Sequence, residues 1–175
     1  MSIKYLIVGS LFGAITLFLW GAVAHMLFPW ENNIIREFAD KEAFLEELKK
    51  SAPQNGIYVD SHGVFAAVSF RPDFGDKFQS MGRNLAIEFA ANIAVAFLLC
   101  LVVAGLRTTS LGARAFLAGL AGLASGFDIL GSFCNWYGFS EAFGLAEIAI
   151  VTVGWFLAGL VIASLQKKMV PGLTS

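Results

Sequence analysis

Charged residues are scarce in this chain of 175 residues, at 14% of the composition, whereas 57% are hydrophobic and the mean hydropathy is +0.71. A soluble domain has about a quarter of its residues charged, so the composition excludes that class and predicts an integral membrane protein. Disordered chains combine low hydrophobicity with high charge, which excludes them too. The chain also lacks a basic excess, with 12 Lys and Arg against 13 Asp and Glu. We therefore expect no nucleic-acid partner.

Cysteine and histidine are nearly absent as well. The two cysteines, Cys100 and Cys134, fall at depths about 20 Å apart in separate apolar runs, too far for a disulfide. They are expected to be buried small side chains, and a thiol oxidoreductase is disfavoured. Of the two histidines, His25 lies in an apolar run and His62 lies in a polar segment, which argues against a haem held by two imidazoles. No H-E-x-x-H motif occurs.

Four apolar runs are long enough for membrane-spanning helices, which need about 20 residues each. They cover Tyr5 to Phe28, Asn84 to Leu106, Leu111 to Asn135, and Phe143 to Leu165. The predicted fold is an all-α membrane protein, a bundle of four transmembrane helices with a small α+β extracytoplasmic loop domain between the first two. In domain terms, residues 1–28 form the first helix, residues 29–83 the loop domain, and residues 84–175 the other three helices with a short cytoplasmic tail.

The first run resembles a secretory signal peptide, since Lys4 precedes it and Ala22-Val23-Ala24 imitates a cleavage site. Its apolar length exceeds the 7–15 residues usual for a signal peptide. We therefore expect it to be a retained anchor.

The basic residues predict the orientation. Five of them lie on one side of a four-span chain, and that side carries no acidic residue: Lys4, Arg107, Arg114, Lys167 and Lys168. By the positive-inside rule this side is cytoplasmic, so both termini are cytoplasmic and the loop of residues 29–83 is extracytoplasmic, in an inner or plasma membrane. Aromatic residues predicted at the outer boundary agree with this placement: Trp30, Trp136 and Tyr137.

The loop domain has the pattern of one helix and one hairpin. Asp40 precedes a stretch with acidic residues early and lysines late, which predicts a helix over residues 40–51. Two apolar segments within residues 57–70 flank Asp60-Ser61-His62-Gly63, which predicts a β-hairpin. We interpret those four residues as a turn rather than a Ser/His/Asp catalytic site. So small a domain needs support from the ends of the helices.

Small residues recur at close-packing intervals in the apolar runs, where they let helices approach closely. They are Gly9, Gly13, Ala118, Gly122, Gly126, Gly154 and Ala158. The pattern leaves open whether they pack helices within one chain or between two copies.

Ionisable residues inside the predicted spans are the main candidates for function, because they are costly in a bilayer and commonly mark functional sites. With the polar residues that share their helix faces, they form a predicted cluster in the outer half of the bundle: His25, Glu88, Asn92, Asp128, Ser132, Asn135 and Glu147. The cluster could be a ligand site, a proton relay, a contact with another subunit or a set of hydrogen-bonded structural residues. Metal binding by His25, Glu88, Asp128 and Glu147 is a weaker alternative, and no cofactor is implied.

Our leading hypothesis is an accessory subunit or binding component that recognises a partner or a lipid-soluble ligand at the outer leaflet. The alternatives are a proton-coupled small transporter and, third, a metal-dependent membrane enzyme. Besides the lipid bilayer, other membrane subunits or further copies of the chain are the expected partners.

Overall fold

Four long helices dominate the computed structural model, which describes residues 2–28, 34, 36, 38–70, 77–106 and 110–170. They are α1 (Ile3–Leu27), α4 (Lys77–Gly105), α5 (Leu111–Tyr137) and α6 (Glu141–Met169). Each contains a segment long and apolar enough to cross a membrane, which confirms the predicted number of spans. Serine side chains cap the starts of α1, α5 and α6 by accepting a backbone N–H bond: Ser2, Ser110 and Ser140.

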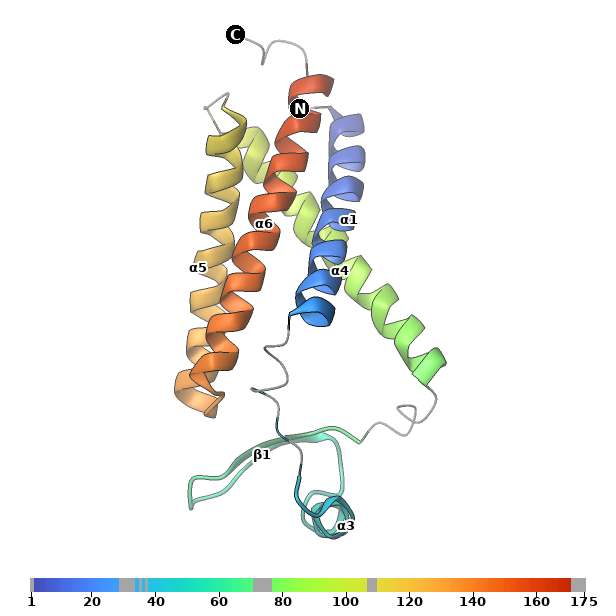
Figure 1. Ribbon diagram of the computed structural model, residues 1–175, viewed down its shortest axis with the longest axis vertical. Coiled ribbons are helices and arrows are strands. Elements are labelled where there is room, and N and C mark those ends of the chain that lie inside the picture. Colours follow the sequence, from blue (N-terminus) through green and yellow to red (C-terminus); the bar gives the residue numbers. More distant parts are fainter. Residues whose placement is uncertain are drawn as a thin grey trace.

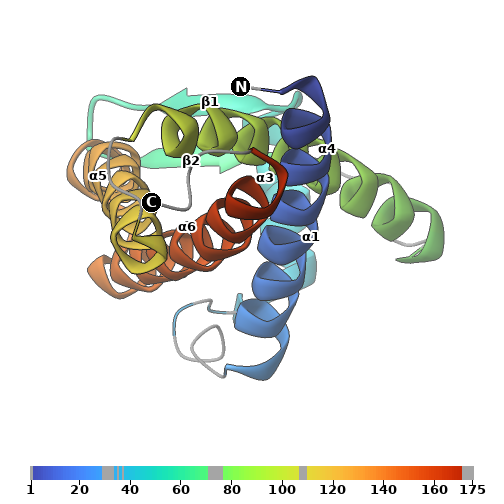
Figure 2. The ribbon, with the colours of Figure 1, turned by 90° about the horizontal axis from the view of Figure 1, so that it is seen from above.

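The four helices do not all run parallel to one another. α5, α6 and α1 lie next to one another in that order, and α4 crosses them diagonally (Figures 1 and 2). One end of the bundle holds the start of α1 and the last turns of α6, and we call it the terminal end. At the other, the loop end, the polypeptide leaves α1 for α3 and the hairpin. The first half of α4 diverges from the other three helices toward the loop end (Figure 1).

Small residues explain how closely α5 and α6 pack. A Cβ added at Gly122 would lie 2.9 Å from Trp155 Cβ, and one added at Gly126 would lie 3.2 Å from Ile148 Cγ1. Further toward the terminal end, a Cβ on Gly159 would lie 2.6 Å from that of Ala118. Such distances leave no room for larger side chains, so these residues hold the two helices together.

The remaining small residues pack α1 against its neighbours. An added Cβ would lie 2.7 Å from Cys100 Sγ at Gly9, 2.9 Å from Ile162 Cδ1 at Gly13, and 2.9 Å from Trp20 Cδ1 at Gly154. Ala158 is fully buried in the same core. All seven predicted packing residues therefore lie in contacts within the chain.

A short helix and a two-stranded hairpin lie between α1 and α4. α3 (Lys41–Ser51) begins at the predicted cap, where the Asp40 carboxylate accepts the Ala43 N–H at 2.9 Å. β1 (Gly56–Val59) pairs antiparallel with β2 (Phe65–Val68), and Gly63 takes the positive φ of 88° in the turn between them. The Phe65 ring stacks on Tyr137, at the end of α5, with 4.8 Å between ring centroids. This stack joins the hairpin to the loop end of the bundle.

Candidate functional site

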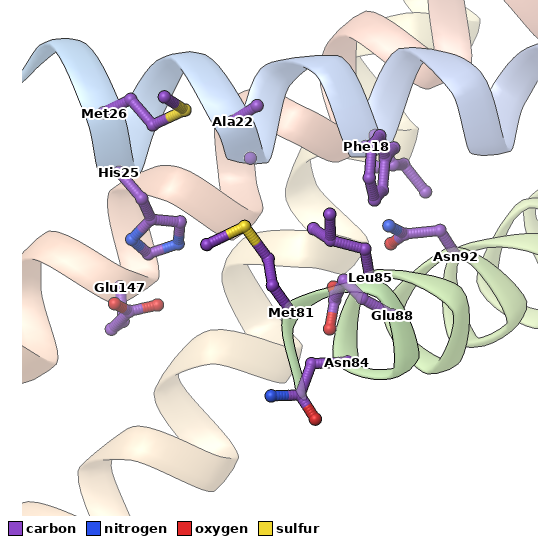
Figure 3. A pocket seen from close by; sticks show the side chains of 12 residues that line it. Phe18, Ala22, His25, Met26, Met81, Asn84, Leu85, Glu88, Asn92 and Glu147 are labelled. Atoms are coloured by element: carbon purple, nitrogen blue, oxygen red, sulfur yellow. The ribbon is translucent and has the colours of Figure 1, made fainter. Parts of the chain in front are cut away.

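A pocket of about 920 Å³ opens at the loop end of the bundle. Its walls come from three helices (Figure 3). The lining residues are Leu17, Phe18, Gly21, Ala22, His25 and Met26 of α1, Met81, Asn84, Leu85, Glu88 and Asn92 of α4, and Glu147 of α6. This volume lies within the range of about 300–1,000 Å³ that is usual for small-molecule sites.

The divergence of α4 creates this pocket. Toward the terminal end α4 is packed tightly, and Ala96, Leu99 and Cys100 are buried. At the inner end of the pocket, Phe18 of α1 and Phe89 of α4 form an edge-to-face pair, and their ring centroids lie 5.6 Å apart. Beyond that pair α1 and α4 separate, and the residues from 81 to 88 are all exposed. The pocket is therefore open at the loop end and closes toward the buried Leu17.

Polar side chains from all three helices face the pocket. His25 of α1 and Glu147 of α6 point toward one another across it, and Glu88 and Asn92 reach in from α4 (Figure 3). Asn92 and Glu147 are half-buried, whereas His25 and Glu88 are exposed nearer the mouth. Four of the seven residues in the predicted cluster thus meet at one pocket. Asn84 lines it as well.

The rest of the lining is apolar, and none of it was among the predicted site residues. Leu17, Phe18, Met26, Met81 and Leu85 contribute hydrocarbon, ring and thioether surface. Their sequence carries no signal of this role, because similar apolar residues make up most of α1 and α4. A site of this composition can hold an apolar molecule and orient it through a few polar groups.

The other three members of the predicted cluster lie elsewhere. Asp128, Ser132 and Asn135 are exposed on α5 and do not line the pocket. The reason is geometric: Asp128 follows Gly126 by two residues, or about 200° around a helix, and Gly126 faces Ile148 of α6. Asp128 therefore points away from α6, and its stripe forms a separate polar face on α5.

A metal centre is not assembled from these residues. In the part of the chain that the structure describes, no three His, Cys, Asp or Glu side chains come close enough to hold a metal ion. Asp128 lies on the far face of α5, and it is one of the four ligands that the metal alternative requires.

A buried polar pair near the terminal end is a feature that sequence reasoning missed. Arg114 is 2% exposed and donates from Nη1 to Oε1 of Gln166, which is 4% exposed. Nearby in the core, Tyr5 donates to the Cys100 carbonyl at 3.1 Å. In the sequence Arg114 looks like one more flanking positive charge, and nothing nearby indicates that it turns inward. Lys4, Lys167 and Lys168 are exposed at this end, whereas Arg107 lies outside the described residues.

The predicted boundary aromatics lie at the loop end where they can be described. Trp136 is exposed at the end of α5, and Tyr137 beside it carries the Phe65 stack. Trp30 lies outside the described residues.

Comparisons of the chain with protein-family models, with curated proteins and with solved structures give no match.

Proposed function

We propose that the protein is a membrane-embedded binding component whose pocket takes a lipid-soluble molecule with a polar head. The observation that carries this proposal is the convergence of His25, Glu88 and Glu147 from three helices on a pocket whose other walls are largely apolar. Ionisable groups in a membrane bundle face protein or water and commonly serve function, and a cleft between divergent helices is open to a ligand arriving from the bilayer.

The same geometry favours binding over proton-coupled transport. A transporter needs a polar route from its site to the other side of the membrane. Next to the pocket the described core is apolar and offers no proton relay: Ala14, Leu17, Ala96, Ala158 and Ile162. The buried polar side chains Tyr5, Ser10, Arg114 and Gln166 lie nearer the terminal end.

We place the pocket in the outer leaflet and the loop domain outside the cell. The support is the exposed Lys4, Lys167 and Lys168 at the terminal end, because cytoplasmic ends are enriched in basic residues. The pocket lies at the opposite end, beneath the segment that holds α3 and the hairpin.

The test uses a neutral long-chain alcohol carrying a photoreactive diazirine. With the wild-type protein in nanodiscs, we expect saturable labelling of the peptides around Phe18–Met26 and Met81–Asn92. Gly21→Leu should reduce this labelling at least tenfold. Gly21 lines the pocket and an added Cβ would meet nothing within 4 Å, so the larger side chain fills the site without disturbing the helix.

Gly131→Leu is the matched control, since Gly131 also has open space around it and lies outside the pocket. It should label like the wild type. Labelling that never saturates, or that Gly21→Leu leaves unchanged, would exclude a binding pocket.

A second role, as an accessory subunit, is favoured by the polar face of α5. Asp128, Ser132 and Asn135 are exposed on a helix that meets the criteria for a membrane span, and a charged residue facing lipid costs about 2.5–3.5 kcal/mol at a helix centre. A neighbouring transmembrane helix would remove this cost.

We expect the protein in mild detergent to migrate as part of a larger complex, with its mass measured by light scattering. Asp128→Leu should release the single chain, whereas Ile129→Ala, which changes an exposed apolar neighbour, should leave the complex intact. A wild-type protein whose measured mass is that of a single chain would contradict this role.

A further inference from the structure

Acidic side chains outnumber basic ones in the described lining of the pocket. Glu88 contributes a carboxyl from α4 and Glu147 another from α6, while His25 is the one basic side chain among the described lining residues. None of the twelve lining residues is Lys or Arg. Arg83 is adjacent to Asn84 in sequence but is not part of the lining.

This imbalance discriminates between head groups. A carboxylate or phosphate head would meet two carboxyls and no Lys or Arg in the described lining, and like charges repel. A protonated amine would instead be attracted to both carboxyls. Its N–H groups could also donate to the side-chain carbonyls of Asn84 and Asn92, since amides and carboxylates are acceptors.

The arrangement of the walls also fits such a molecule. The buried Leu17 and the half-buried Phe18 form the apolar inner end, and His25 and Glu88 lie nearer the exposed mouth. Glu88 and Glu147 approach from different helices (Figure 3), so a head group between them would be attracted from two sides. An aliphatic tail could lie against Leu17, Phe18 and Leu85.

We infer that the pocket selects long-chain amines over lipid-soluble molecules of the same length with an anionic head. This inference rests on the proposed function, because it assigns the ligand class of the same site.

The test compares three diazirine probes with the same alkyl chain, bearing an amine, an alcohol or a carboxylic acid, on the full-length protein in uncharged nanodiscs at pH 7. The amine should label the pocket peptides at least tenfold more than the acid, with the alcohol between them. In Glu88→Gln the ratio of amine to acid labelling should fall severalfold, and further in the double variant with Glu147→Gln.

Glu141→Gln is the matched control, because Glu141 is an exposed carboxyl on α6 outside the pocket, and it should keep the wild-type ratio. If the double variant does not fold, as judged by thermal unfolding, Glu88→Gln alone decides, since that residue is exposed. Equal labelling by all three probes, or stronger labelling by the acid, would overturn the inference and leave the binding function standing. Absence of saturable labelling by every probe would instead remove the proposed function.

Discussion

Asp60 shows what a single side chain contributes to the loop domain. Its Oδ1 atom accepts the backbone N–H of Val64 at 3.1 Å and that of His62 at 2.8 Å. These bonds favour the charged carboxylate and hold the pKa of Asp60 below its ordinary value. The sequence predicted a turn here, and the residues Asp60 and Gly63 explain it.

Asp60 makes the stability of the hairpin depend on pH. A carboxylate whose pKa is lower in the folded chain stabilises the fold above its unfolded pKa of about 3.9, and the contribution is lost as the pH falls through the folded value. We expect amide hydrogen exchange at His62 and Val64, measured by NMR with correction for intrinsic rates, to accelerate as the pH falls below about 4. Asp60→Ala should raise the exchange rates already at pH 7, and unchanged rates in that variant would show that the carboxylate does not hold the turn.

Other residues show where prediction from sequence ends. Glu88, Asn92 and Glu147 could be selected because polar side chains are rare in membrane spans, and the structure brings them to one pocket with His25. Asp128 satisfied the same criterion at a similar predicted depth but lies on another face. The depth of a residue in the membrane follows from its position along the helix. The direction in which its side chain points depends on how that helix is rotated against its neighbours.

Among the helices, close packing occurs where glycine and alanine leave room for the neighbouring helix. The glycine rows could be recognised in the sequence, but their partners could not, because the same spacing serves contacts within a chain and between chains. Gly122 against Trp155 and Gly13 against Ile162 are both contacts within the chain. α4 carries a row of the same spacing in its first half, at Gly82, Ala86 and Ala90, yet these residues are exposed where α4 separates from the bundle.

The α5–α6 contact should be sensitive to one methyl group. In Gly122→Ala the new Cβ would lie 2.9 Å from Trp155 Cβ and 3.1 Å from the Val151 carbonyl oxygen, so the helices must shift. We expect a loss of about 1–3 kcal/mol, as is usual for overpacked cores, measured by thermal or denaturant unfolding in detergent.

Gly131→Ala is the control in the same helix, because its Cβ would meet nothing within 4 Å. Alanine favours a helix by about 1 kcal/mol over glycine, so this variant should be as stable as the wild type or more stable. If Gly122→Ala were equally stable, the close contact between α5 and α6 would not be rigid.

At the scale of the whole molecule, both ends of the bundle can be tested for their side of the membrane. In a Cys134→Ser background, Ser61→Cys places a thiol in the hairpin turn and Lys168→Cys places one in the last turn of α6. A membrane-impermeant maleimide should label Ser61→Cys in intact cells and Lys168→Cys after lysis alone. Cys100 is fully buried and should stay unlabelled, and the reverse pattern would invert the proposed orientation.

Composition and local pattern were enough to predict the four long apolar helices and the two small elements between the first two of them. Four apolar runs required four helices, because in lipid each backbone polar group must be paired within its own segment. Asp40 and the turn at residues 60–63 likewise specified the small helix and the hairpin through local bonds. Only the folded chain shows that α4 diverges, that Arg114 turns inward to Gln166, and that the described lining of the pocket comes from three helices. Helix rotation and crossing depend on contacts between residues far apart in the chain, such as Phe18 with Phe89. On largely apolar helices these contacts leave little trace in the local sequence.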